Sequence, residues 1–141
     1  MQHIFVYGSL LFPEITKKLT EKSFKTLPAT LQGYKMYCVK GCDYPAIFQQ
    51  KDAVTNGLLL KNVDDLSLDI ISFYEGDEYE KRQVSVNSDG KSATALTFVW
   101  VNKNDLLDDE DWDLQHFEKT SLEYYLNEVI TQTLEEFHRN R

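Results

Sequence analysis

The chain has 141 residues, of which 42% are hydrophobic and 13% aromatic, and its formal net charge is −8 at pH 7. This length and composition predict one globular domain with a full core rather than a disordered chain. The acidic balance argues against binding of nucleic acid or anionic membrane surfaces, because both bind basic patches. No apolar run reaches the roughly 18 residues of a membrane-spanning helix.

The first predicted element is a buried strand at Ile4-Phe5-Val6, an apolar run of β-branched and aromatic residues. It continues into Tyr7-Gly8-Ser9-Leu10, where Gly8 would allow a positive φ or a close backbone approach. Pro13 favours a first helical turn, so a short helix is predicted over 13–19. A strand, glycine loop and helix in this order can present backbone N–H groups to a carboxylate or an oxyanion. An ordinary turn with one glycine is the alternative.

The middle of the chain predicts strands separated by glycine and proline. Alternation over 34–39 indicates a strand, while 24–31 is mixed and predicts no element. Pro45 forces Tyr44 into extended geometry, and a further strand is predicted at 46–48. Another follows at 54–60, where Gly57 indicates a bulge or a close backbone approach.

A central helix of about ten residues is predicted next, capped by Asp64 or Asp65 and stopped by Gly76. Strands at 79–86 and 93–101 follow, joined by a turn at 88–90.

The tail predicts an acidic segment and then a long helix. The segment Asp108 to Asp113 lacks the ligand spacing of a calcium loop, so we interpret it as a solvated loop or as the N-terminal charge of the next helix. Thr120-Ser121-Leu122-Glu123 matches a capping box before a helix that ends near Arg139. Six or seven strands, a short central helix and a long C-terminal helix favour an α+β fold with a small mixed or antiparallel barrel-like sheet. We expect one domain over 1–141, with a core at 3–101 and a helical extension at 112–139.

Glu75 is the candidate for proton transfer. It stands at the predicted end of the central helix, where the helix dipole and aromatic neighbours both disfavour a carboxylate. Both effects raise its pKa from a usual value of about 4.3 toward neutrality, where an acid can move protons. The alternative, slightly favoured by these residues alone, is a Glu75 that frays into solvent or pairs with Lys81 or Arg82.

Three short motifs occur in order along the chain: Tyr7-Gly8-Ser9-Leu10, Tyr44-Pro45-Ala46, and Phe73-Tyr74-Glu75-Gly76 followed by Tyr79 and Arg82. Together they resemble the gamma-glutamylcyclotransferase-like superfamily, and particularly its avirulence-induced-gene-like branch of small plant proteins. The resemblance runs from about Ile4 to Trp100, and the tail containing Asp111-Trp112-Asp113 is also similar to that branch. Each motif is short, but three in register are fairly specific.

The resemblance implies a small mixed barrel with a cavity that binds a glutamyl group. It implies that Glu75 is the catalytic acid/base and that loop amides contact the substrate. The substrate-binding residues so implied are Tyr7, Gly8, Ser9, Leu10, Tyr44, Pro45, Ala46 and Tyr79, with Arg82 in a supporting role.

The implied reaction is lactam formation from a γ-glutamyl amide. The α-amine of the substrate would attack its own γ-carbonyl, releasing 5-oxoproline and an amine, with proton transfer through Glu75. This chemistry needs no metal, no cofactor and no protein nucleophile, so Ser9 is interpreted as a loop residue. We expect a monomer that acts on a small molecule and binds neither nucleic acid nor membrane. Cys38 and Cys42 are expected as free thiols, and without a signal-peptide pattern we expect a cytoplasmic protein.

Two other functions stay open from the sequence. One is a non-catalytic module that binds a small anion or a peptide end. The other is a protein-interaction domain in a stress response that uses the acidic loop near Asp108. An intact Glu75 favours the enzyme, because a binder of anions gains nothing from a carboxylate facing its ligand.

Overall fold

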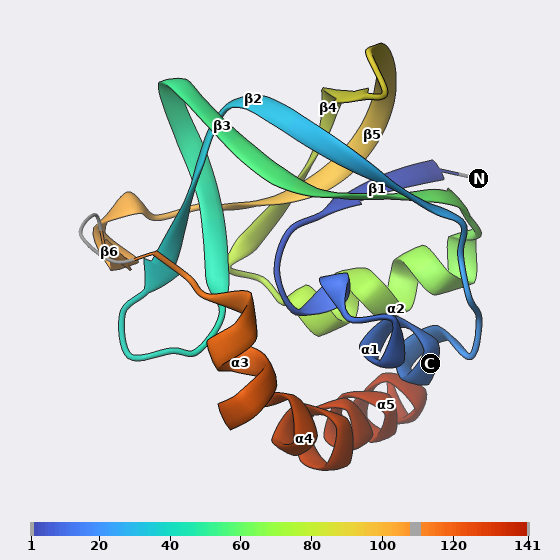
Figure 1. The fold of residues 1–141 in the computed structure, drawn as a ribbon. Helices are drawn as coiled ribbons and strands as arrows, with labels where there is room; N and C mark the ends of the chain where they lie inside the picture. The colour runs from blue at the N-terminus through green and yellow to red at the C-terminus, as the bar shows by residue number, and fades with distance from the viewer. Residues whose placement is uncertain (1, 108–110, 141) are drawn as a thin grey trace.

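The computed structural model describes residues 2–107 and 111–140. In these residues it is a barrel of five strands with one added strand, and helices cover one side of the barrel (Figure 1). The strands are β1 (Gln2–Val6), β2 (Thr26–Val39), β3 (Pro45–Val63), β4 (Tyr79–Ser88), β5 (Lys91–Trp100) and β6 (Leu106–Leu107). The helices are η1 (Ser9–Leu11), α1 (Pro13–Thr20), α2 (Asp65–Glu75), η2 (Lys103–Asp105), α3 (Leu114–Thr120), α4 (Leu122–Tyr124), η3 (Tyr125–Val129) and α5 (Ile130–Arg139).

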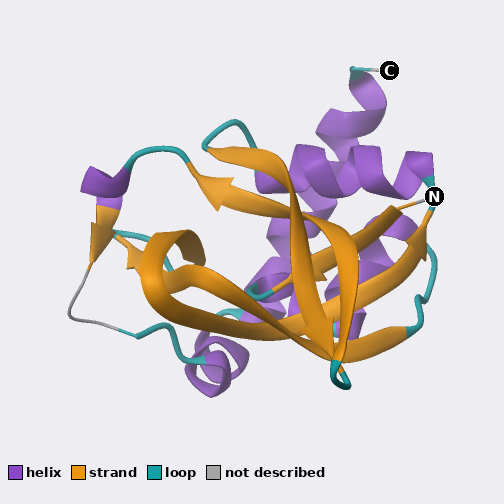
Figure 2. Cartoon of the chain, turned by 90° about the horizontal axis from the view of Figure 1, so that it is seen from above, coloured by secondary structure: helices purple, strands orange, loops and turns teal. Residues whose placement is uncertain are grey.

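The barrel closes through four antiparallel strand pairs and two short parallel ones, of which β3 with β5 meets at Ile47 and Val99. β3 is antiparallel to both β1 and β2, and β4 is antiparallel to both β2 and β5. The ring closes where β5 runs parallel to β1, at Ile4 and Leu96. β6 pairs with β2 outside this ring. Seen from above, the long strands curl around a common interior (Figure 2). The predicted α+β fold with a barrel-like mixed sheet is therefore confirmed.

Strand β1 is buried on both faces, which explains its unbroken apolar run. Side chains of a strand alternate between faces. Phe5 belongs to the core inside the barrel, whereas Ile4 and Val6 belong to the core between barrel and helices. This second core holds buried residues from α1, α2, α3 and α5, among them Ile15, Ile71, Phe117 and Ile130. The strand that carries the Tyr7-Gly8-Ser9-Leu10 loop is thus fixed from two sides.

The predicted strand boundaries were wrong in the middle of the chain. β2 begins at Thr26 rather than at residue 34, and β3 runs unbroken from Pro45 to Val63 where two strands were predicted. Residues 45–49 and 54–60 of β3 both pair with β2, and residues 50–53 between them form an irregularity opposite Gly33, where Asp52 has a φ of +65°. At Gly57 the structure shows a close approach rather than a bulge, since a Cβ atom there would lie 2.2 Å from the carbonyl oxygen of Val6.

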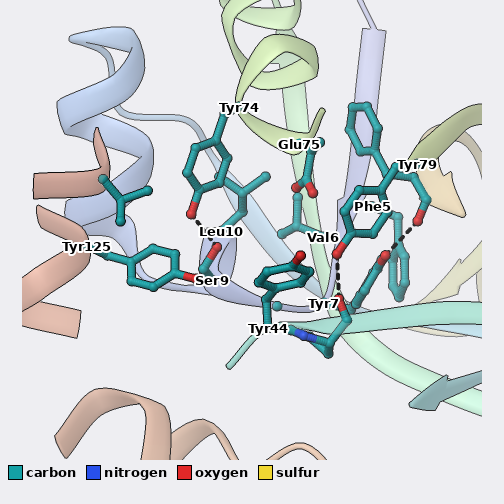
Figure 3. A pocket seen from close by; sticks show the side chains of 14 residues that line it. Phe5, Val6, Tyr7, Ser9, Leu10, Tyr44, Tyr74, Glu75, Tyr79 and Tyr125 are labelled. Carbon is teal, nitrogen blue, oxygen red and sulfur yellow. Dashed lines mark hydrogen bonds between the residues drawn. The ribbon is translucent and has the colours of Figure 1, made fainter. Parts of the chain in front are cut away.

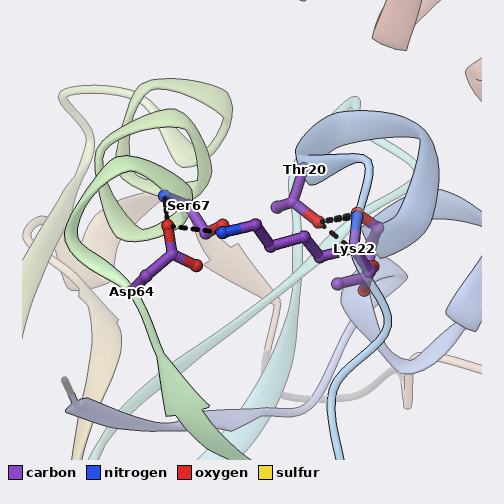
Figure 4. Close-up of polar contacts among 5 residues, drawn as sticks. Thr20, Lys22, Asp64 and Ser67 are labelled. Carbon is purple, nitrogen blue, oxygen red and sulfur yellow. Dashed lines mark hydrogen bonds and ion pairs between the residues drawn. The ribbon is translucent and has the colours of Figure 1, made fainter.

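Helix α2 is capped as predicted. The Asp64 Oδ2 atom accepts a hydrogen bond from the Ser67 N–H at 3.2 Å and pairs with the Lys22 Nζ atom at 3.1 Å (Figure 4). Gly76, with φ of +89°, follows the last helical residue. Glu75 is that last residue. Asp64 and Gly76 therefore fix the two ends of the helix that positions the Glu75 side chain.

The tail differs from the prediction at its start. A separate helix, α3, begins after Asp113, whose Oδ1 atom accepts from the Gln115 and His116 N–H groups at 2.9 and 3.3 Å. Thr120 is the last residue of that helix, and Ser121 makes no side-chain cap bond, so the predicted capping box is wrong. From Leu122 the helix runs through a π-helical segment, η3, into α5. Of the acidic segment, residues 108–110 lie outside the described residues. No described helix has both the length and the apolar character required to cross a membrane.

Candidate functional site

A pocket of about 220 Å³ lies where the barrel meets the helices (Figure 3). It receives residues from the end of β1 and the following loop, from the start of β3, from the end of α2, and from β4, β5 and η3. Its lining consists of Phe5, Val6, Tyr7, Gly8, Ser9, Leu10, Tyr44, Pro45, Tyr74, Glu75, Tyr79, Phe98, Tyr125 and Val129. Aromatic rings dominate the lining, and none of the described residues that form it is a lysine, arginine or histidine. A carboxylate and phenol hydroxyls are thus its main polar side-chain groups.

Glu75 projects into this pocket from the C-terminal end of α2 (Figure 3). Burial raises the pKa of its carboxyl group to about 8. Among the described residues, none donates a hydrogen bond to this carboxylate or forms an ion pair with it. The carboxylate is therefore available to a ligand, and its pKa lies close to physiological pH.

Four of the pocket tyrosines differ from Glu75, because their hydroxyl groups are already hydrogen-bonded within the protein. The Tyr7 hydroxyl donates to the Phe98 carbonyl oxygen at 2.6 Å, and the Tyr79 hydroxyl donates to the Pro45 carbonyl oxygen at 2.7 Å. The hydroxyls of Tyr74 and Ser9 lie 2.7 Å apart.

Burial, reinforced by the nearby charge of Glu75, raises the pKa of the Tyr7 and Tyr79 hydroxyls. Both phenols therefore stay protonated and act as fixed donors that hold the pocket walls in place.

The loop after β1 passes close to the start of β3. A Cβ atom at Gly8 would lie 2.9 Å from the Pro45 Cγ atom, so glycine is required by this approach. Gly8 has φ of −119°, so a positive φ is not the reason. Within the described backbone, the N–H groups of Gly8, Ser9 and Leu10 donate no hydrogen bond. These donors are free for a bound ligand.

The structure places most of the predicted site residues around this one pocket. The residues brought together are Tyr7, Gly8, Ser9, Leu10, Tyr44, Pro45, Glu75 and Tyr79. Two predicted residues lie elsewhere. Ala46 is fully buried in a core with Trp100, and Arg82 lies exposed on β4, where it pairs with Glu80 at 2.9 Å.

Sequence reasoning missed several lining residues. Tyr74 could have been included as the neighbour of Glu75, and Val6 as the neighbour of Tyr7. Phe98, Tyr125 and Val129 carry no local signal, because only the folded chain brings β5 and η3 to the pocket.

The cysteines and the potential metal-binding side chains are the candidates for a second site within the part of the chain that the structure describes. Among the described residues, Cys38 and Cys42 form no disulfide bond. Within residues 2–107 and 111–140, no group of three or more His, Cys, Asp or Glu side chains is placed to hold a metal ion.

Known proteins resemble this chain over most of its length. The sequence model of the family described as "Gamma-glutamyl cyclotransferase, AIG2-like" matches residues 4–114. Protein AIG2 C of Arabidopsis thaliana is 35% identical over 124 residues, which cover 83% of this chain and 75% of that protein. AIG2-like protein D of the same plant is 32% identical over 130 residues, which cover 89% of this chain and 85% of that protein.

Solved structures resemble this chain in fold. The solution structure of an Arabidopsis thaliana protein matches with a TM-score of 0.69 and 30% identity, covering 99% of this chain and 84% of that one. A structure described as a gamma-glutamyl cyclotransferase shares the fold, with a TM-score of 0.59 and 23% identity, over 72% of this chain and 67% of that one. The match to the family model and the identity to these relatives show that this chain belongs to the AIG2-like gamma-glutamyl cyclotransferase family.

Proposed function

We propose that this protein is a γ-glutamyl cyclotransferase that converts a γ-glutamyl amide into 5-oxoproline and a free amine. The observation that carries the proposal is the Glu75 carboxylate, which lies in an aromatic pocket with a raised pKa and with no internal partner among the described residues. No described residue forms an ion pair with this carboxylate, so the α-ammonium group of a γ-glutamyl substrate can serve as its cationic partner. Family membership gives the proposal independent support.

The reaction moves two protons from the α-ammonium nitrogen of the substrate to the nitrogen of the leaving amine. Ionised Glu75 takes a proton from the α-ammonium group, and the freed nitrogen attacks the γ-carbonyl carbon to form a five-membered ring. The C–N bond to the leaving amine then breaks as Glu75 passes that proton to the leaving nitrogen. The ring nitrogen gives up its second proton through Glu75 to the same amine, which leaves as an ammonium ion. Attack and departure are parts of one molecule, so the pocket contributes mainly by holding the two ends together. Water is neither consumed nor released.

The loop after β1 is the proposed site for the charge that develops on oxygen. The N–H groups of Gly8, Ser9 and Leu10 have no backbone acceptor, and this loop lines the same pocket as Glu75. Preorganised backbone donors of this kind stabilise an oxyanion or a substrate carboxylate. Ser9 is not proposed as a nucleophile, because its hydroxyl contacts that of Tyr74 and no histidine is found among the described lining residues.

The test is the release of 5-oxoproline from a panel of γ-glutamyl amides by the Glu75→Gln variant. Glutamine keeps the shape of the side chain but cannot carry the proton, so we expect turnover to fall by about a thousand-fold or more. Glu80→Gln is the matched control, because Glu80 lies exposed on β4 and its change should leave turnover intact. Far-UV circular dichroism checks that both variants are folded.

Turnover that survives in Glu75→Gln would contradict the mechanism. A wild-type protein that binds γ-glutamyl amides in calorimetry but never releases 5-oxoproline would instead be a binding module.

A further inference from the structure

Two residues of the Glu75 pocket come from beyond the range that the family model matches. The match ends at residue 114, whereas Tyr125 and Val129 are the first and last residues of the π-helical segment η3. Single π-helical turns within α-helices occur frequently at functional sites. The C-terminal helix therefore contributes a wall of the pocket as well as packing against the barrel.

A pair of hydrogen bonds joins this C-terminal part to the loop between β2 and β3. The Tyr125 hydroxyl donates to the Asp43 Oδ1 atom at 2.7 Å, and the Trp112 indole N–H donates to the Asp43 carbonyl oxygen at 2.9 Å. Tyr125 is buried against Phe117, with ring centroids 4.8 Å apart. Burial, together with the hydrogen bond to Asp43, raises the pKa of the Tyr125 hydroxyl, so it remains a donor at any physiological pH.

Asp43 is the first of three consecutive residues that each contact a different part of the site. Tyr44 lines the pocket and also a larger groove of about 890 Å³ beside it. Pro45 accepts the hydrogen bond from Tyr79 and lies against Gly8. The segment 43–45 therefore connects the C-terminal helix, strand β4 and the glycine loop.

We propose that Asp43 and Tyr125 are positioning residues for the reaction at Glu75. Their hydrogen bond fixes the segment 43–45, and with it the Tyr44 wall, against the C-terminal helix in the arrangement that binds the substrate. This inference rests on the proposed function. Neither residue exchanges a proton with the substrate, so loss of the bond loosens the Tyr44 wall but leaves Glu75 in place. Substrate binding then falls more than the chemical step.

The first test is the kinetics of Tyr125→Phe, which keeps the ring and removes the hydroxyl. We expect KM for a γ-glutamyl amide to rise by about ten-fold, the effect of losing one hydrogen bond to a charged group, while kcat stays within about two-fold. Tyr124→Phe is the matched control, because the neighbouring Tyr124 is 61% exposed and does not line the pocket. Its KM should equal that of the wild type.

The second test separates positioning from general packing. Asp43→Ala should raise KM as much as Tyr125→Phe, and the double variant should be no worse than either single variant, since both remove the same bond. Asp43→Asn keeps an acceptor oxygen for the Tyr125 hydroxyl and should restore most of the affinity. Additive effects, or a KM unchanged in both single variants of an active enzyme, would overturn the inference.

Backbone hydrogen exchange over residues 40–48 provides a readout that does not depend on turnover. Exchange should be faster in Tyr125→Phe and Asp43→Ala than in Tyr124→Phe, because the segment has lost its anchor. Equal exchange in all three variants would overturn the positioning role, even in a protein without activity. A wild type that turns over no γ-glutamyl amide, yet shows this difference in exchange, would refute the proposed function and retain the Asp43–Tyr125 anchor.

Discussion

Glu75 shows at the scale of one residue why an ionisable group at a functional site opposes stability. Its carboxyl has a pKa raised to about 8 by burial, so the folded state holds the proton more tightly than the unfolded state does. Between the unfolded pKa and about 8, the unfolded state therefore binds fewer protons, and the free energy of unfolding falls as pH rises. This loss of stability has the same cause as the raised pKa, which is the desolvation of the carboxylate.

Glu75→Gln should accordingly stabilise the protein at high pH and leave it unchanged in acid. One pKa unit corresponds to about 1.4 kcal/mol, and solvent that reaches the carboxylate through the pocket mouth reduces the effect. We expect about 2 kcal/mol at pH 9, which raises Tm by roughly 6 °C. Thermal unfolding of the wild type and Glu75→Gln at pH 4, 7 and 9 measures this. A Tm difference that does not grow with pH would show that the carboxylate is well solvated.

Helix α2 shows, at the scale of one element, how the cap at its first turn helps to position Glu75 at its last turn. Asp64 begins the helix that ends in Glu75, and its carboxylate accepts the Ser67 N–H and pairs with Lys22 (Figure 4). The hydrogen bond from Ser67, with Lys22 nearby, lowers the pKa of Asp64 to about 2. Because its folded-state pKa is depressed, Asp64 contributes stability above its unfolded pKa, and that contribution is lost as pH falls toward 2.

Asp64→Ala should destabilise the protein by about 1 kcal/mol at pH 7, the usual cost of losing an N-cap. Asp64→Asn separates the two partners, because its side-chain oxygen still caps the helix but no longer pairs with Lys22. The pair is partly exposed, so Asp64→Asn should lose only a small part of that amount. Urea titrations at pH 7 and pH 2.5 measure both variants. Equal losses in the two variants at pH 7 would assign the stability to the ion pair instead of the cap.

The elements themselves were predictable to the extent that their signals are local. The apolar run of β1, the Asp64 cap and the Gly76 stop could be read from neighbouring residues, and the structure confirms them. The early start of β2 could not, because its polar residues are held by pairing with β3. The continuation of β3 through residues 50–53, which have no partner in β2, carries no local signal either. The same distinction holds for the pocket: the loop after β1 and Glu75 carried local signals, whereas Tyr125 lies in the distant segment η3 and carries no local signal for the site.

At the scale of the whole molecule, barrel and helices share one core. Ile4 and Val6 of β1 belong to the same buried cluster as Phe117, Ile130 and Phe137 of the C-terminal helices. Removing either part would expose the apolar surface of the other, so neither gains by unfolding alone. This arrangement favours cooperative unfolding of the entire chain.

The two tryptophans allow that cooperativity to be measured. Trp100 lies buried in β5, and Trp112 precedes α3, so Trp112→Phe leaves a probe of the barrel and Trp100→Phe leaves a probe of the C-terminal part. In each variant, the urea midpoint from fluorescence should coincide with the midpoint from far-UV circular dichroism. A fluorescence midpoint of Trp100→Phe well below its dichroism midpoint would reveal C-terminal helices that unfold first.

The absence of basic side chains from the pocket lining has a consequence for the end of the proposed catalytic cycle. The substrate enters with an ammonium group that attracts the Glu75 carboxylate. Ring closure turns that nitrogen into a neutral lactam, and Glu75 is ionised again once the leaving amine has taken its proton. The product then keeps its own carboxylate beside a like charge. In the proposed cycle, the electrostatic attraction during substrate entry thus becomes repulsion after turnover, which favours release of the product.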